Sequence, residues 1–194
     1  MDMDGRVDLI EGVHDVTLES VTLFTAEDKP TSLHFDFRGI QNEEPAYVLH
    51  KTNLDGKTEA QLQSQVFPRI AQVLNHLSGT NRTDIEKMFK AAEANEGLGD
   101  WEKLVKEINK YLGTIKEDKT CRVLVVSQWY KGQKYFSVPP FGTVVDRTGG
   151  SKLIFDADKH IGKNKEDAEV PADNGGYKTP GTAAKATAKK IGLE

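Results

Sequence analysis

The sequence predicts a β-rich α+β domain, and three successive patterns lead to that fold class. Residues 12–52 contain three strand-like stretches separated by short polar turns. Residues 58–113 change to a helical period, and residues 121–138 return to strand character. This order is typical of an OB-fold-like antiparallel barrel with a helical insertion between strands 3 and 4. A generic α+β sheet with helices on one face gives the same order and stays open as the alternative.

The first strand group is predicted from residue alternation. Leu33, Phe35 and Phe37 alternate with polar residues, which indicates a strand with one buried side and one solvent-facing side. In the strand before it, the apolar phase slips by one residue after Leu18, as a β-bulge would produce. The three strands are expected at Gly12–Thr25, Ser32–Arg38 and Ala46–Thr52.

The helical block is predicted from apolar residues spaced near 3.6 residues apart, beginning with residues 58–78. Pro68 lies inside this stretch, so we expect a break or kink near Phe67. The segment Thr83-Asp84-Ile85-Glu86 fits a capping box that opens a second helix. Asp100 is expected to cap a third.

The second strand group is predicted as a hairpin. Cys121–Trp129 and Lys134–Val138 flank the turn Tyr130-Lys131-Gly132-Gln133. Two further short strands are expected at Phe141–Val145 and Ser151–Phe155.

These patterns predict one OB-like domain, residues 1–155 with its helical insertion at about 58–113, followed by a flexible low-complexity tail, residues 156–194. The tail is expected to be flexible because its later part holds Gly, Thr, Ala and Lys with little to bury. A helix at Ala183–Lys190 is a candidate contact for a protein partner, and a homo-oligomer is a further expectation.

Composition favours a cytoplasmic protein, in the host cytoplasm if the protein is viral. The one cysteine, Cys121, cannot form an internal disulfide and lies in an apolar run that predicts a buried thiol. Met1–Gly5 is acidic, unlike a signal peptide, and no apolar run approaches the roughly 18 residues of a membrane span. We therefore expect no membrane partner.

No catalytic constellation is recognisable, so the sequence predicts a protein that is not an enzyme and uses no cofactor. Gly149-Gly150-Ser151-Lys152 lacks the spacing of a phosphate-binding loop, and no nucleophile elbow is present. The five histidines are scattered, and the alternating Asp156, Asp158 and His160 are explained as well by a solvated turn as by a metal site. We predict no metal site. An enzyme of unrecognised type would need a deep pocket with convergent titratable groups.

A cationic, aromatic stretch is the main functional signal. Residues 119–153 hold six basic residues and one acidic residue, whereas residues 1–50 hold eleven acidic and three basic residues. Aromatic rings stack on bases and cations follow phosphates, so this mixture suits a single nucleic-acid strand. Rings that fill the core beside solubilising lysines remain the alternative. The candidate nucleic-acid-binding residues are Arg38, Lys51, Arg122, Trp129, Tyr130, Lys131, Lys134, Tyr135, Phe141 and Arg147.

A further signal comes from the segments Gly12-Val13-His14-Asp15-Val16-Thr17-Leu18, Ser32-Leu33-His34-Phe35-Asp36-Phe37, Tyr47-Val48-Leu49-His50-Lys51-Thr52-Asn53-Leu54, Val123-Leu124-Val125-Val126, Tyr135-Phe136-Ser137-Val138-Pro139 and Phe141. With these segments, the chain resembles bacteriophage single-stranded-DNA-binding proteins over about residues 9–155. The resemblance implies an OB-fold that coats exposed single strands cooperatively, in replication and recombination.

The sequence therefore predicts a non-specific single-stranded DNA-binding protein. A virion structural protein, or an assembly and interaction protein without catalytic activity, is the alternative. The alternative is motivated by the tail, which is rich in lysine and alanine.

Overall fold

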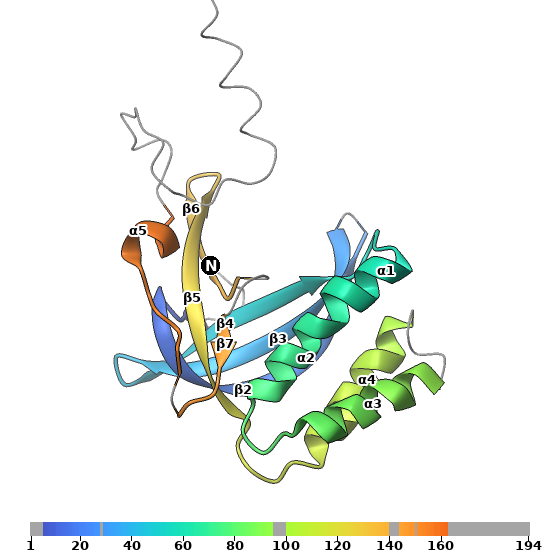
Figure 1. Ribbon diagram of the computed structural model, residues 1–194. Coiled ribbons are helices and arrows are strands. Elements are labelled where there is room, and N and C mark those ends of the chain that lie inside the picture. Colours follow the sequence, from blue (N-terminus) through green and yellow to red (C-terminus); the bar gives the residue numbers. More distant parts are fainter. Residues whose placement is uncertain (1–5, 28, 95–99, 140–143, 150, 163–194) are drawn as a thin grey trace, which may run out of the picture.

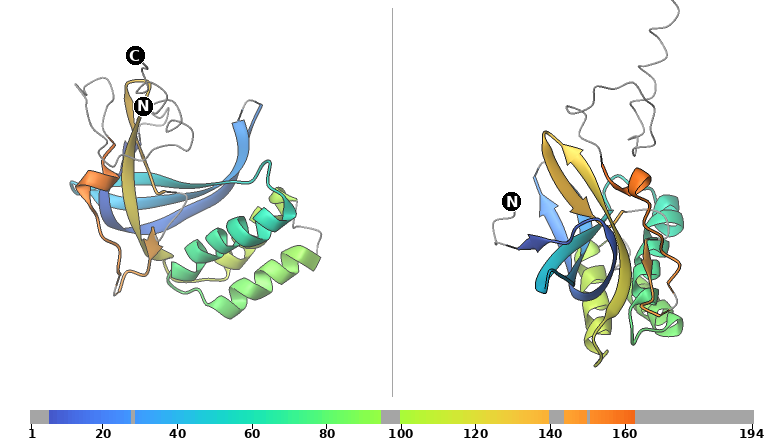
Figure 2. Two further views of the ribbon diagram at one scale, coloured as in Figure 1. Left: turned by 45° about the horizontal axis from the view of Figure 1, so that its top comes forward. Right: turned by 90° about the vertical axis from the view of Figure 1, so that its left-hand side faces the viewer.

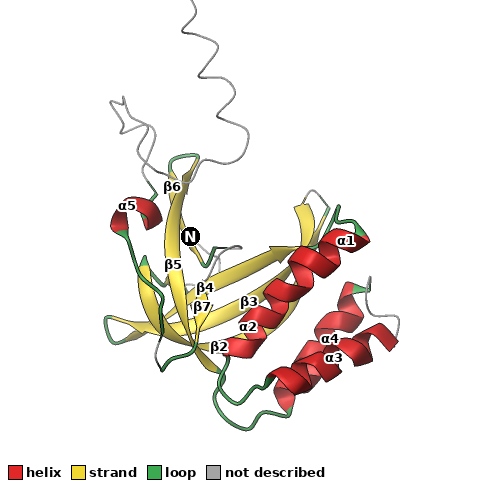
Figure 3. Ribbon diagram, viewed as in Figure 1, coloured by secondary structure: helices red, strands yellow, loops and turns green. Residues whose placement is uncertain are grey.

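The computed structural model places a curved, mostly antiparallel sheet beside a layer of helices, which confirms the α+β class (Figures 1 and 3). It describes residues 6–27, 29–94, 100–139, 144–149 and 151–162. The strands are β1 (Val7–Asp8), β2 (Gly12–Ala26), β3 (Lys29–Gln41), β4 (Glu44–Asn53), β5 (Thr120–Tyr130), β6 (Gln133–Ser137) and β7 (Val145–Asp146). The helices are α1 (Glu59–Gln61), the π-helical η1 (Leu62–Val66), α2 (Phe67–His76), α3 (Arg82–Ala94), α4 (Trp101–Gly113) and α5 (Ala157–His160).

Strand β2 is shared between two parts of the sheet. Its first residues, Gly12–Thr17, pair with β5, and Thr17–Ala26 pair with β3. The register with β3 shifts between Leu18 and Ser20, which confirms the predicted bulge. A bulge bends a strand and increases its twist, so one 15-residue strand can serve both partners.

The inner face of the sheet forms the core together with the helices. Leu33, Phe35 and Phe37 are fully buried on this face of β3, as the alternation predicts. Ile70 of α2 and Ile108 of α4 belong to the same buried cluster. Figure 2 shows α1 to α4 gathered on one side of the strands, so these four helices do not cover the opposite side of β2, β3 and β4.

The predicted break near Phe67 is present as a change of helix type. The π-helical η1 ends where α2 begins at Phe67, and Pro68 occupies the first turn of α2. Proline fits there because the first turn of a helix does not need its N–H. The predicted break is thus a π-helical turn that interrupts the helix, and not a simple kink.

The start of α3 differs from the prediction. Asn81, and not Thr83, caps this helix: its side-chain oxygen accepts a hydrogen bond from the Asp84 backbone N–H at 2.9 Å. The Asn81 side-chain amide in turn donates to the Asp84 carboxylate at 2.6 Å, whereas a capping box would use the Asn81 backbone N–H, which donates to the Tyr111 hydroxyl at 3.3 Å. Asp100 caps α4 as predicted and accepts from the Lys103 N–H at 3.1 Å.

The β5–β6 hairpin forms as predicted and projects past the end of the sheet (Figure 1). Beyond β6, Val138 forms a parallel bridge with His50 of β4 and donates its N–H to Leu49 at 3.0 Å. The chain therefore returns to the third strand of the first group. On the other half of β5, the short β7 pairs with Arg122 and Val123.

The last predicted strands are only partly present. Of Phe141–Val145, residues 141–143 lie outside the described residues and Val145 begins β7. Ser151–Phe155 does not form a strand, because the N–H of Lys152 bonds to the Asp146 side chain at 2.9 Å and not to a neighbouring strand.

The predicted tail begins with a short ordered stretch. α5 follows Asp156, and the N–H of Gly162 donates to the Ser127 hydroxyl of β5 at 3.1 Å. Residues 163–194, including the candidate partner helix, lie outside the described residues. Within the described chain, no helix is long and apolar enough to span a membrane.

One buried histidine lies on the inner face of the sheet. His50 is 3% exposed, and burial, with the nearby charge of Arg69, lowers its pKa from 6.5 to about 4. Neither its Nδ1 nor the Thr52 hydroxyl has a hydrogen-bond partner among the described residues. His50 is therefore held neutral in the folded protein at neutral pH.

We predict that acid destabilises the protein through His50. The unfolded chain protonates this imidazole near pH 6.5 and the folded chain only near pH 4, so stability falls across that window. The expected contribution is about 2 kcal/mol of unfolding free energy between pH 8 and pH 5. Urea unfolding of wild type and His50→Leu measures it as the difference between the two pH profiles. Parallel profiles would assign the acid sensitivity to another group.

Candidate nucleic-acid interface

The β5–β6 hairpin ends in a two-residue turn. Lys131 and Gly132 have backbone φ angles of +51° and +74°, as a type I′ turn requires. Glycine adopts such angles without strain, whereas lysine does so at some cost. The turn places the Lys131 amino group 5.3 Å from the centre of the Tyr130 ring. A cation and an exposed ring therefore lie together at the tip.

The hairpin carries exposed rings on both faces. Trp129 lies opposite Lys134 in the ladder and shares its face, whereas Tyr130 and Tyr135 lie on the other face. The exposed fractions are 36% for Trp129, 63% for Tyr130 and 48% for Tyr135. Phe136 is half-buried and packs against the core. Three rings of the cluster thus meet solvent, where they can contact a ligand.

Three of the candidate cations are paired with acids. Hydrogen bonds from Arg122 lower the pKa of Asp15. Burial acts to raise the pKa of Glu11, but the bonds from Lys134 and Ser127 outweigh it and lower this pKa. Both carboxylates are therefore charged at neutral pH and balance the cations beside them. The pairs are Arg38 with Glu19 at 2.7 Å, Arg122 with Asp15 through two bonds of 2.7 Å, and Lys134 with Glu11.

The other described candidate cations lack such partners. Within the described chain, Lys51, Lys131 and Arg147 form no ion pair. Lys51 and Lys131 are exposed on β4 and at the hairpin tip, whereas Arg147 donates to the Asn75 carbonyl of α2 at 3.4 Å. Lys51 and Lys131 therefore keep a free charge for a phosphate.

The fold brings the candidate residues into separate groups. Five of them share the hairpin, and Arg38 and Lys51 lie on the outer face of the sheet. Arg122 and Arg147 lie near β7. Phe141 is outside the described residues.

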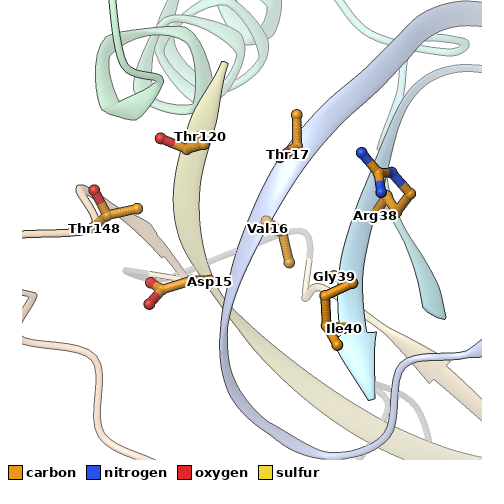
Figure 4. A pocket seen from close by; sticks show the side chains of 8 residues that line it. All are labelled: Asp15, Val16, Thr17, Arg38, Gly39, Ile40, Thr120 and Thr148. Atoms are coloured by element: carbon orange, nitrogen blue, oxygen red, sulfur yellow. The ribbon is translucent and has the colours of Figure 1, made fainter. Parts of the chain in front are cut away.

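A shallow hollow lies beside one of the candidate residues, Arg38. It encloses about 260 Å³ and is lined by residues that include Asp15, Arg38, Thr120 and Thr148. Figure 4 shows the Asp15 carboxylate with Thr120 and Thr148 on one side of β2, and Arg38 on the other. Both groups take part in ion pairs, Asp15 with Arg122 and Arg38 with Glu19.

The outer face of β2, β3 and β4 carries further rings that the sequence pattern did not single out. Phe24 stacks on His34 with 5.1 Å between ring centroids. The guanidinium of Arg6 lies 4.5 Å from the centre of the Tyr47 ring. Alternation in β3 already placed His34 on this face, but Phe24 follows the bulge, where the phase of β2 changes. Rings and cations thus recur on a second surface, beside Lys51 and Arg38.

The chain matches no protein-family model, and comparison with curated proteins finds no match.

We predict that the hairpin turn depends on glycine at position 132. A Cβ there would meet no atom within 4 Å, so Gly132→Ala tests the backbone conformation alone. The positive φ should cost about 1 kcal/mol in unfolding free energy. Lys131→Asn, which suits the first position of this turn, should be neutral or slightly stabilising. Urea denaturation measures both, and an unaffected Gly132→Ala variant would contradict the turn geometry.

Proposed function

We propose that the protein binds single-stranded DNA without sequence preference, in the manner of the bacteriophage proteins that its sequence resembles. The observation that carries the proposal is the hairpin tip, where exposed Trp129, Tyr130 and Tyr135 accompany Lys131, which forms no ion pair with any described residue. Base–ring stacking contributes about 1–3 kcal/mol per base and tolerates any base. A non-enzymatic role in replication or recombination, in the host cytoplasm, follows as part of the proposal.

We also propose that the sheet is an OB-type barrel. Its support is the order of pairing: β2 with β3, β3 with β4, and β2 again with β5 after the helical block. The hairpin partner β6 leads back to β4 through the parallel bridge of Val138 with His50. In this proposal the five strands close into a ring through that bridge, with the helices inserted between the third and fourth strands.

The barrel proposal suggests where single-stranded DNA lies on the protein. In OB-folds the face of the second and third strands, with the loops beside it, contacts oligonucleotides. Here those strands are β3 and β4, whose outer face carries Lys51 and the rings of His34 and Tyr47. The hairpin tip corresponds to one of the flanking loops. We infer that the single DNA strand lies along this face and is held by the hairpin.

A protein–protein role is the second candidate, because apolar side chains are exposed near the β3–β4 turn. Val7, Ile10 and Ile40 are 43%, 45% and 62% exposed, and Ile10 bonds through its N–H to Gln41 of the same region. Exposed apolar groups of this kind suit contact with another protein. An assembly role predicts oligomers that do not depend on DNA.

We predict that a single-stranded oligonucleotide quenches Trp129 fluorescence. The titration uses Trp101→Phe protein, so that Trp129 is the only fluorophore of its kind, with oligodeoxythymidylate at 50 and 300 mM salt. Two phosphate contacts should give roughly a tenfold weaker affinity at the higher salt. Duplex DNA and oligouridylate are run in parallel. If 50 mM salt gives neither quenching nor a gel shift, the DNA-binding proposal is wrong. This holds whether or not light scattering detects oligomers.

The contribution of the tip charge is tested by Lys131→Glu and Lys131→Asn. We expect both to weaken binding, Glu more than Asn, and Lys131→Asn to lower the magnitude of the salt slope by about 0.7 for one lost phosphate contact. Lys106→Glu, an exposed position on the helical α4, is the matched control and should bind as wild type does. If Lys106→Glu and Lys131→Glu weaken DNA binding equally, the effect comes from the net charge of the protein and not from the hairpin tip.

A further inference from the structure

Strands β2 and β3 bring two rings into parallel contact on the outer face of the sheet. The planes of Phe24 and His34 lie within 8° of parallel, with centroids 5.1 Å apart. The Ser32 hydroxyl lies 2.9 Å from Nε2 of His34 and holds the imidazole in this orientation. Both rings are half-buried, so part of the stack remains open to solvent.

The charges around this stack are mostly positive. Lys51 lies directly opposite His34 in the β3–β4 ladder, and the Lys29 amino group lies 5.8 Å from the centre of the other ring. Asp36 is the acidic group on the same face of β3, and Arg6 binds it at 2.7 Å. The neighbours from β2 in this part of the ladder, Phe24 and Thr22, are uncharged. An anion would therefore find cations here and an acid that is already paired.

We propose that His34 is a phosphate-binding residue of this face and that it takes up a proton from the solvent when a single strand docks. The proposal rests on the DNA-binding function above. An imidazolium stacked on Phe24, with Lys51 beside it, forms a compact cationic site for a phosphate. The neutral ring offers stacking alone. Binding thus creates part of its own counter-charge.

In the free protein, the surroundings of His34 favour its neutral form, which can take up a proton when DNA binds. Burial and the charge of Lys51 lower the pKa of His34, against the opposing effect of Asp36. The free side chain is therefore mostly neutral at pH 7. A phosphate beside it favours the charged form and raises the pKa. By linkage, a group whose pKa rises on binding makes binding tighter as pH falls.

The direct test follows the His34 ring protons by NMR across a pH titration, with and without saturating oligodeoxythymidylate. His34→Gln assigns the signal. We expect the pKa to rise by about one unit in the complex. An unchanged pKa in protein whose Trp129 fluorescence is quenched would overturn the role of His34 and leave the DNA-binding function in place. Absence of quenching would instead remove the function on which this inference rests.

Affinity across pH gives the second test. Wild-type protein should bind up to about tenfold more tightly at pH 5.5 than at pH 8, as a one-unit shift requires. His34→Gln should lose this dependence, and His34→Lys should bind tightly at both pH values. His14→Gln, which alters a histidine of β2 bonded to the Ile10 carbonyl, should behave as wild type. A pH dependence that survives in His34→Gln would place the proton elsewhere and overturn the proposal.

Discussion

The arrangement depends on one shared strand. β2 pairs with β3 through its second half and with β5 through its first half, and the bulge between Leu18 and Ser20 lets it bend between them. Without that bend, the β3–β4 pair and the β5–β6 hairpin would not be held at a fixed angle. The bend therefore positions both surfaces that carry exposed rings. It also turns the inner sides of both strand groups toward one buried core.

The same strand explains the charge distribution. The acidic N-terminal part and the basic later part look like separate features of the chain, yet they meet across β2. Glu11 and Asp15 pair with Lys134 and Arg122 of the basic part, and Glu19 pairs with Arg38 of the acidic part itself. Two of the six cations of residues 119–153, Arg122 and Lys134, are thus neutralised within the fold. Among the candidate cations, Lys51 and Lys131 are exposed and form no ion pair with the described residues, so they mark the surfaces where a phosphate would gain most.

The sequence pattern correctly predicted features of the fold that depend on short-range interactions. Alternation in β3, the bulge in β2, the Asp100 cap and the Lys131–Gly132 turn each arise from a few neighbouring residues. The predicted strand Ser151–Phe155 was wrong, because the N–H of Lys152 bonds to the Asp146 side chain and that of Leu153 to the Ser151 hydroxyl. The predicted cap of α3 was wrong by two residues. Asn81 and Thr83 are both good caps, and which of them begins the helix depends on how the chain leaves α2.

The site was harder to predict for the same reason. The hairpin residues are close in sequence, so their grouping was visible, and so was the presence of cations. Their neutralisation was not visible, because Asp15 and Arg122 are 107 residues apart and meet only through the β2–β5 register. The Phe24–His34 stack likewise needs the register that follows the bulge. Side-chain exposure and pairing across strands therefore require the structure.

The central claim is that a single strand lies on the outer face of β3 and β4 and is gripped by the hairpin. Amide chemical-shift mapping of ¹⁵N-labelled protein with an oligodeoxythymidylate tests it most directly. The account predicts shifts concentrated at Phe24, His34, Lys51 and residues 129–135, with α3 and α4 unaffected. Shifts confined to the helices, or to the apolar region around Ile40, would contradict it.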